Sequence, residues 1–274
     1  MTTATPQDVI IVGGGAAGLS AAMVLARAHY TVTIVDNNQQ SNLVAPEAHA
    51  VFTRDNTSPA ELYTTARAQL MQYPSVQYID DTVLTLRKDG VFQAQLQTGT
   101  TLSAHTVVLA QGVTYQLPDI PGLQALWGTK VWHCPYCHGY EAFGKKILAI
   151  MDAEKTKHMK LFLPKWVEDV AYTDSALALR VDDTPMGVKV TFTNGEVGEF
   201  DEILAQTAFV ARDKLADDLG CKRDASGAVT VDSMNMTTVD GVYSAGDQSS
   251  AMKQVNLAVA AGHIVGTAIT LRPR

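Results

Sequence analysis

Two of the three cysteines in this 274-residue chain, Cys134 and Cys137, are separated by two residues in the motif CPYC. A Cys-x-x-Cys pair at a helix start can open and close as a disulfide, because the helix N-terminus lowers the pKa of the thiol it faces. In a reducing compartment such a pair is more often catalytic or metal-binding than structural. We interpret it as a redox dithiol. Cys221 stands alone, and we expect it to be buried packing.

Other interpretations of CPYC are open. Half of a zinc site would need further ligands, and the sequence offers none nearby unless His133 and His138 both contribute. A buried structural pair is also conceivable. Glutaredoxins carry CPYC too, but near the start of a much shorter chain, whereas here the motif lies mid-chain. We favour the redox dithiol and predict no metal site.

A histidine and a carboxylate follow the motif closely. His138 comes directly after Cys137, and Glu141 lies three residues further on. A histidine that titrates near neutrality can take a proton from an incoming thiol and return it to a leaving thiolate. We therefore predict that His138 is the base and that Glu141 orients its ring. A surface histidine that caps a helix is the alternative.

A glycine-rich loop near the N-terminus predicts dinucleotide binding. Gly13, Gly15 and Gly18 satisfy GxGxxG between a β-branched strand and a helix of small residues. Asp36 ends the next strand, 18 residues after Gly18. Missing Cβ atoms let the backbone approach a pyrophosphate, and the helix N-terminus offers it N–H groups. Asp36 can accept hydrogen bonds from ribose hydroxyls, although the motif alone does not separate FAD from NAD.

Hydrophobic periodicity predicts the elements that must position these motifs. We expect strands at residues 9–12, 31–35, 83–86, 92–96, 107–109, 147–151, 170–173, 188–192 and 203–206. We expect helices at residues 16–27, 59–73, 155–163 and 255–270, the last with Gly262 and Gly266 on a close-packed face. The proline-rich stretch 112–122 shows neither period, which places a domain boundary there. The pattern predicts two successive α/β units.

Composition excludes several classes of protein. A hydrophobic content of 46% rules out disorder along the whole chain. The net charge is −7 and no block of basic residues occurs, so nucleic acid and anionic membrane are poor candidates for partners. The sequence shows neither a signal peptide nor an apolar run of the roughly 18 residues that a membrane span needs. We expect a cytoplasmic protein.

Several segments, in their order and spacing, resemble low-molecular-weight thioredoxin reductases: VIIVGGGAAGLSAA, VVLAQGVTYQLPDIPG, CPYC, LGCKRDASGAVTVD and GVYSAGDQSSAMKQV. Two more, HAVFTRDNTSPAEL and WHCPYCHGYE, resemble the branch of dithiol oxidases that close the disulfides of gliotoxin, holomycin and romidepsin. The resemblance implies two Rossmann-like three-layer α/β domains, FAD as cofactor, and a homodimer. It implies a discontinuous FAD-binding domain at 1–113 and 242–274, with a dithiol domain inserted at 114–241.

The resemblance also implies a set of FAD contacts along the chain. They are Gly13, Gly15, Gly18, Asp36, Asn42, Val83 through its backbone, Gly112, Asp247, Lys253, Gln254 and Val255. Lys253 stands where arginine is common in the reductases. Cys137 would face the flavin, and Cys134 would exchange with substrate.

The second domain departs from the reductases at their NADPH site. After the strand at 147–150, Asp152 and Glu154 stand where backbone should meet a pyrophosphate. The stretch 172–174 offers no arginine for a 2′-phosphate. A divergent site would have to use lysines, namely Lys155, Lys157 and Lys160. We predict that NADPH does not bind.

Together these features predict an FAD-dependent dithiol oxidase. Cys134 would take electrons from a substrate dithiol, Cys137 would pass them to flavin, and dioxygen would become hydrogen peroxide. The substrate would be a small dithiol or a thioredoxin-like protein. Two alternatives are a disulfide reductase fed by NADPH, reduced ferredoxin or another flavoprotein, and a non-catalytic, redox-sensing FAD protein.

Overall fold

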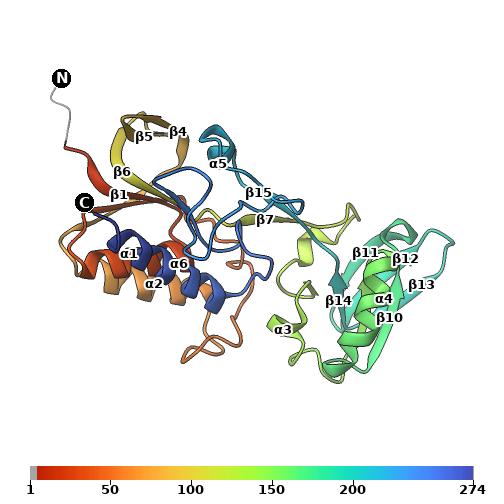
Figure 1. Ribbon diagram of the computed structural model, residues 1–274. Coiled ribbons are helices and arrows are strands. Elements are labelled where there is room, and N and C mark those ends of the chain that lie inside the picture. The colour runs from red at the N-terminus through yellow and green to blue at the C-terminus, as the bar shows by residue number, and fades with distance from the viewer. Residues whose placement is uncertain (1–4, 274) are drawn as a thin grey trace. The chain divides into compact units, whose positions relative to one another are not determined.

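A computed structural model describes residues 5–273, and Figure 1 shows its helices and strands. Its contacts divide the chain into two compact units. The first consists of the chain up to Ser41, Ala60–Thr114 and the chain from Val210 onward. The second consists of Asn42–Pro59 and Tyr115–Phe209. The break after Thr114 falls inside the proline-rich stretch where the sequence places a boundary.

The second boundary differs from the expected one at residue 242. Residues 210–241 belong to the first unit, because Leu215, Cys221 and Val229 join the buried cluster of its strands. The segment 42–59 groups with the second unit, although the sequence assigned it to the FAD domain. The hydrophobic periodicity of residues 42–59 and 210–241 does not indicate to which unit each segment belongs.

The first unit is built on a seven-stranded sheet in the order β3-β2-β1-β6-β5-β4, with β16 also beside β6. The strands are β1 (Gln7–Val12), β2 (Val32–Asp36), β3 (Val76–Asp80), β4 (Val83–Asp89), β5 (Val91–Leu96), β6 (Thr101–Leu109) and β16 (Val242–Ser244). Its helices are α1 (Ala16–Arg27), α2 (Pro59–Leu70), α5 (Leu215–Asp218) and α6 (Val255–Thr270). β1, β2, β3, β6 and β16 pair in parallel, whereas β4 and β5 form an antiparallel extension.

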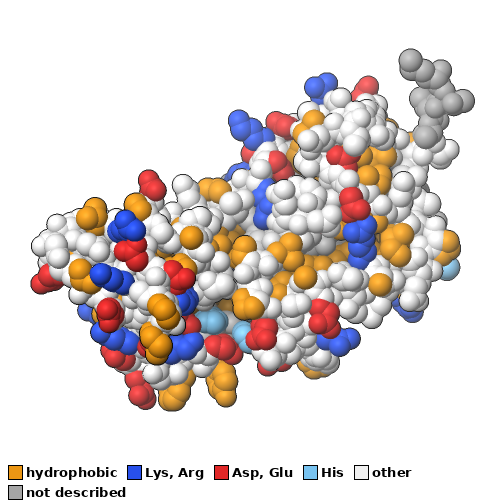
Figure 2. All heavy atoms as spheres, turned by 180° about the vertical axis from the view of Figure 1, so that it is seen from behind, with side chains coloured by type: hydrophobic (Ala, Val, Ile, Leu, Met, Phe, Trp, Pro, Cys, Tyr) orange, Lys and Arg blue, Asp and Glu red, His pale blue; other side chains and the backbone are white. Residues whose placement is uncertain are grey.

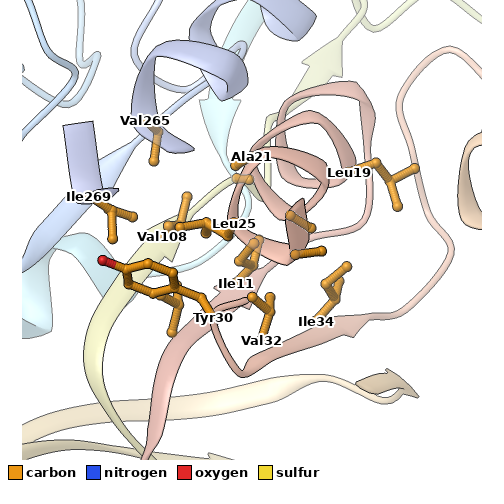
Figure 3. Packing of buried hydrophobic residues seen from close by; sticks show 14 of the residues in the cluster. Ile11, Leu19, Ala21, Leu25, Tyr30, Val32, Ile34, Val108, Val265 and Ile269 are labelled. Atoms are coloured by element: carbon orange, nitrogen blue, oxygen red, sulfur yellow. The ribbon is translucent and has the colours of Figure 1, made fainter. Parts of the chain in front are cut away.

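The core of this unit lies on both faces of the sheet. In Figure 3, residues such as Ile11 and Val108 pack towards Leu25 of α1. Neighbouring residues of the same strands face a second buried cluster, because successive side chains of a strand point to opposite faces. The predicted close packing of the last helix is confirmed: a Cβ at Gly262 would overlap the Ala17 carbonyl oxygen. Small residues let α1 and α6 approach closely.

The second unit also has three layers. A parallel sheet in the order β10-β9-β14-β8 lies between α4 on one face and an antiparallel sheet, β11-β12-β13, on the other. The strands are β8 (Val131–Trp132), β9 (Lys146–Ile150), β10 (Asp169–Thr173), β11 (Ala178–Thr184), β12 (Gly187–Phe192), β13 (Val197–Phe200) and β14 (Glu202–Ala205). The helices are α3 (Pro135–His138) and α4 (Ala153–Phe162), with single 3₁₀ turns at Gln124–Leu126, Leu163–Lys165 and Ser175–Leu177. The segments linking the units form paired strands, β7 (Val113–Gln116) and β15 (Ala208–Ala211).

The helices and the surface charges can be compared with two classes that the composition disfavours, membrane-spanning and nucleic-acid-binding proteins. No helix within residues 5–273 combines the length and hydropathy that a membrane span requires. On the face drawn in Figure 2, Lys and Arg side chains are interspersed with Asp and Glu, and no continuous basic area is visible there. That face therefore lacks the electrostatic footprint of a nucleic-acid site.

Candidate functional site

The two cysteines of CPYC form a disulfide at the start of α3, with their Cα atoms 5.2 Å apart. Cys134 is the N-cap, and its carbonyl accepts the backbone N–H groups of Cys137 and His138 at 3.0 and 3.1 Å. Pro135 takes the first helical position, where its missing N–H costs no hydrogen bond. Both cysteines are half-buried. The predicted pairing at a helix start is thus found.

Cys221 lies apart from this disulfide. It is buried, and its Sγ lies 3.5 Å from the Thr237 Oγ1 atom. Burial raises the pKa of the Cys221 thiol, which keeps it in the unreactive protonated form. The expectation that this cysteine is core packing is confirmed.

The carboxylate beside His138 is Glu202, which corrects the predicted pairing of His138 with Glu141. The Nε2 atom of His138 lies 3.2 Å from Oε2 of Glu202. Glu141 instead lies against His49, with Oε1 3.6 Å from Nε2. The helical spacing does not apply, because α3 ends at His138 and the chain continues through turns. Glu202 is 64 residues from His138, so local spacing carried no signal for it.

The carboxylate of Glu202 is in contact with three side-chain hydrogen-bond donors. Besides His138, it accepts a hydrogen bond from Trp132 Nε1 at 2.8 Å and one from Lys145 Nζ at 2.5 Å. Its burial alone would raise the pKa of Glu202, but the hydrogen bonds from His138 and Lys145 outweigh this effect and lower it. The side chain is therefore an anion at neutral pH although only 7% of Glu202 is exposed.

A second histidine, His133, precedes Cys134 and lies among aromatic rings. Its ring centroid is 4.5 Å from that of Tyr115 and 5.3 Å from that of Trp127. Burial lowers the pKa of His133 to about 4, so this ring is neutral at pH 7. His133 and His138 have different neighbours, and no group of three metal-ligating side chains occurs in the described part of the chain. The zinc interpretation gains no support.

Two aromatic side chains close to the disulfide in sequence are exposed. Tyr136, between the two cysteines, is 56% exposed, and its ring lies 5.1 Å from that of Trp166 and 5.4 Å from that of Phe162. Tyr140 is 85% exposed. Rings of this kind offer apolar faces to a ligand.

The glycine loop fits a bound pyrophosphate. A Cβ at Gly13 would overlap the Ala110 carbonyl oxygen, and a Cβ at Gly18 would overlap the Gly13 carbonyl oxygen. These two glycines therefore close the loop. At Gly15, the N-cap of α1, a Cβ would meet nothing nearer than Gln40 Cγ at 3.7 Å. The missing Cβ of Gly15 thus leaves open space beside the helix N-terminus, where phosphate binds in dinucleotide folds.

Asp36 is also placed as a ribose acceptor would be. It ends β2, and its Oδ2 atom accepts hydrogen bonds from Tyr78 at 2.6 Å and Gln40 at 2.8 Å. These bonds fix the carboxylate at the carboxyl end of a parallel strand, which is where ligands bind in open α/β sheets.

The C-terminal group of predicted FAD residues lies between β16 and α6. Burial raises the pKa of Asp247, against the opposing charges of Lys253 and Arg212. Lys253 donates from Nζ to the Ser250 carbonyl at 2.7 Å. Gln254 is the N-cap of α6, and Val255 is its first residue.

The remaining predicted contacts are divided between the two units. Val83 is buried at the start of β4, and Gly112 follows β6 with a φ of +69°. Asn42 groups with the second unit, whereas the other ten predicted FAD residues lie in the first. The residues of the first unit fit FAD; each individual contact stays a prediction.

In the second unit, the corresponding helix N-terminus is occupied by the chain itself. Asp152 caps α4 by accepting the Lys155 backbone N–H at 2.7 Å, and its other carboxylate oxygen accepts from Gln206 Nε2 at 2.7 Å. The Lys155 hydrogen bond, followed by that of Gln206, lowers the pKa of Asp152. A carboxylate therefore stands where a nucleotide phosphate would need the same N–H group. The lysines considered for a divergent site, Lys155, Lys157 and Lys160, are exposed.

Comparisons with known proteins agree with this architecture. The model of one family, described as pyridine nucleotide-disulphide oxidoreductase, matches residues 7–151 and 142–262. Thioredoxin reductase tcpT from Claviceps purpurea (strain 20.1) is 32% identical, over 97% of this chain and 94% of that protein.

Solved structures are similar over nearly the whole chain. A putative thioredoxin reductase TrxB from Bacillus anthracis has a TM-score of 0.92 at 25% identity and covers 97% of this chain and 97% of its own. The structure of HlmI has a TM-score of 0.92 at 28% identity, covering 99% of this chain and 93% of its own. The predicted fold class and the resemblance to thioredoxin reductases are confirmed.

Proposed function

Because the chain belongs to the pyridine nucleotide-disulphide oxidoreductase family, whose thioredoxin reductase-like members are FAD-binding flavoenzymes, we propose that it is an FAD-dependent dithiol oxidase. It oxidises a small dithiol at the Cys134–Cys137 disulfide, and dioxygen is the final electron acceptor. The observation that carries this proposal is the capping of α4 by Asp152, which removes the phosphate-binding end of the second nucleotide site. In the proposed function the electrons come from the thiol substrate.

The chemistry of the disulfide follows from thiol exchange. One substrate thiolate attacks Cys134 Sγ, which forms a mixed disulfide and releases Cys137 as a thiolate. The second substrate thiol attacks the substrate sulfur of that mixed disulfide, so the product leaves as a disulfide and the enzyme keeps two reduced cysteines. Bound FAD supplies a two-electron acceptor that dioxygen reoxidises to give hydrogen peroxide. The overall reaction is dithiol plus dioxygen to disulfide plus hydrogen peroxide.

His138 accepts and returns the proton during the thiol exchange. Thiolate, not thiol, is the nucleophile, so the incoming thiol must lose a proton before attack. His138 follows Cys137 directly, and its ring is held by Glu202 at 3.2 Å. It takes this proton and later returns it to a leaving thiolate. Exposed Tyr136 and Tyr140 offer apolar faces that favour a small apolar dithiol as the substrate.

A disulfide reductase is the second candidate, and the name of the relative tcpT, a thioredoxin reductase, favours it. The same cysteines would then run in the opposite direction, reduced by NADPH, reduced ferredoxin or another flavoprotein. The two functions differ in what reduces the flavin.

An anaerobic titration separates the two functions. In holoenzyme kept free of oxygen, we expect dithiothreitol to bleach the flavin absorbance through the Cys134–Cys137 disulfide. Readmitted air should restore the colour once the dithiothreitol is consumed, and should yield one hydrogen peroxide for each dithiothreitol oxidised. The same excess of NADPH should leave the spectrum unchanged, because Asp152 occupies the helix N-terminus that its pyrophosphate needs. Dithionite, which should bleach every sample, is the control. Rapid bleaching by NADPH would establish the reductase instead.

The role of His138 is tested by His138→Gln. Glutamine can keep a hydrogen bond to Glu202 but cannot exchange a proton near neutrality. We expect dithiol-dependent oxygen uptake at pH 7 to fall by about ten-fold or more. His49→Gln, at the other histidine–carboxylate contact, is the matched control and should have a smaller effect. Equal rates for His138→Gln and the unmodified enzyme would remove the assignment.

A further inference from the structure

The contact between Glu202 and His138 indicates that Glu202 does more than pack in the core. We propose that Glu202 is the positioning residue of the dithiol centre: it keeps Nε2 of His138 protonated and thereby makes Nδ1 the atom that accepts the substrate proton. The proton-transfer half of this inference rests on the proposed function. The tautomer of His138 does not, and it can be measured separately.

The sheet of the second unit builds this arrangement. Glu202 begins β14, which pairs in parallel with β9 on one side and β8 on the other. Trp132 ends β8, two residues before Cys134, and Lys145 directly precedes β9. β9, β14 and β8 are consecutive strands of one sheet, so Glu202 and Trp132 lie on paired strands and Lys145 is next to one.

The three hydrogen bonds decide the protonation of His138. Oε2 of Glu202 accepts from Trp132 Nε1 at 2.8 Å and lies 3.2 Å from His138 Nε2, while Oε1 accepts from Lys145 at 2.5 Å. An ionised carboxylate has no proton to give, and it can only accept. Nε2 of His138 must therefore be the donor in this contact. In the neutral ring the lone pair then lies on Nδ1.

The charged neighbours of His138 act in opposite directions. The anionic carboxylate of Glu202 favours the protonated ring, and the ammonium of Lys145 on the same carboxylate opposes it. Trp132 contributes a ring 5.4 Å away, and Glu141 is engaged with His49 instead. Cys137, the adjacent residue, is uncharged while the disulfide is closed. Removing Glu202 should therefore lower the pH at which His138 titrates, and removing Lys145 should raise it.

The test is NMR of ¹⁵N- and ¹³C-histidine-labelled holoenzyme with the disulfide closed. In the unmodified protein we expect His138 to carry its proton on Nε2. In Glu202→Gln the titration midpoint of His138 should fall by about 1 pH unit, because the anion is lost. In Lys145→Met it should rise by about 0.5, because the opposing cation is lost and Glu202 stays. His133, which packs against Tyr115 and Trp127, is the internal control and should not move.

Turnover adds the functional half of the test. Lowering the basicity of His138 should move the acid limb of the kcat/KM profile to lower pH and reduce the plateau about ten-fold in Glu202→Gln. Lys145→Met should move the limb the other way. A purely structural role of Glu202 would lower the rate at every pH without moving either limb.

The outcomes separate this inference from the proposed function. A proton on Nδ1, or midpoints that stay fixed in both variants, overturns the positioning role, even if dithiols are oxidised rapidly. The predicted tautomer and shifts without any dithiol oxidation would keep the positioning role and reject the oxidase. If Glu202→Gln does not fold, the tautomer of the unmodified protein and the Lys145→Met shift still decide, since Lys145 is 38% exposed and tolerates replacement more readily.

Discussion

We expect the replacement of either Cys134 or Cys137 by serine to lower the proposed dithiol oxidation by about a thousand-fold or more, while FAD stays bound. Each serine removes one sulfur of the disulfide, and with it the bond that a substrate thiol would attack. The FAD residues of the first unit are unaffected, so the yellow colour should remain. Oxygen uptake with a dithiol, together with the flavin spectrum, measures both effects.

The two serine variants should differ in what they trap. Cys137→Ser leaves Cys134 as a lone thiol, which we expect to form a stable mixed disulfide with an activated aromatic disulfide reagent. Cys134→Ser should react more slowly, if Cys134 is the sulfur that meets substrate. Cys221→Ala is the matched control, because its Sγ is buried in the core of the first unit. Retention of more than a small fraction of turnover in either serine variant would end the disulfide mechanism.

We expect Gly18→Ala to yield protein with little FAD and a lowered melting temperature. The new Cβ would overlap the Gly13 carbonyl oxygen, which is backbone and cannot move unless the loop opens. Overpacking of this kind costs about 1–3 kcal/mol of folding free energy. Both the flavin-to-protein absorbance ratio and the unfolding temperature of the apoprotein should fall.

Gly15→Ala distinguishes a requirement of the ligand from a requirement of the fold. Within the protein its Cβ would meet only Gln40 Cγ at 3.7 Å, an ordinary contact, so the apoprotein should unfold at nearly the same temperature. FAD retention should still fall, because the methyl group fills space beside the N-terminus of α1. Gly90→Ala, in the turn between β4 and β5, is the control: its φ of +68° makes alanine strained, so it should lower stability but still retain FAD. Full FAD occupancy in Gly15→Ala would place the pyrophosphate elsewhere.

The variants above test the disulfide and FAD binding, whereas the oxidase proposal depends on the nucleotide site of the second unit. Asp152 follows β9 and caps α4 with its own carboxylate, and we infer that it fills the phosphate-binding position while the second α/β unit keeps its architecture. A change of one loop can remove a ligand from a fold without changing the fold. The anaerobic titration tests this consequence directly.

Local sequence signals predicted some elements with the observed bounds. The helices expected at 16–27 and 255–270 are α1 and α6. Both begin after glycine or polar residues and carry small side chains that pack on each other, so the signals lie within a few residues of each boundary. Several strands were not predicted, among them β3, β7, β8, β11, β13 and β15. The residues of β3 are mostly half-buried or exposed, and β11 carries several charged residues, so neither shows clear alternation.

The sequence by itself determined the reactive centre and the nature of the cofactor loop, because both are read from residues close together in the chain. Cys134, Cys137 and His138 span five positions, and Gly13, Gly15 and Gly18 span six. Only the tertiary structure decided what surrounds them. Parallel pairing of β14 with β8 and β9 brings Glu202 to His138, while Glu141 turns to His49. Strand order fixes such contacts, and it is set by packing of the whole unit rather than by the spacing of neighbouring residues.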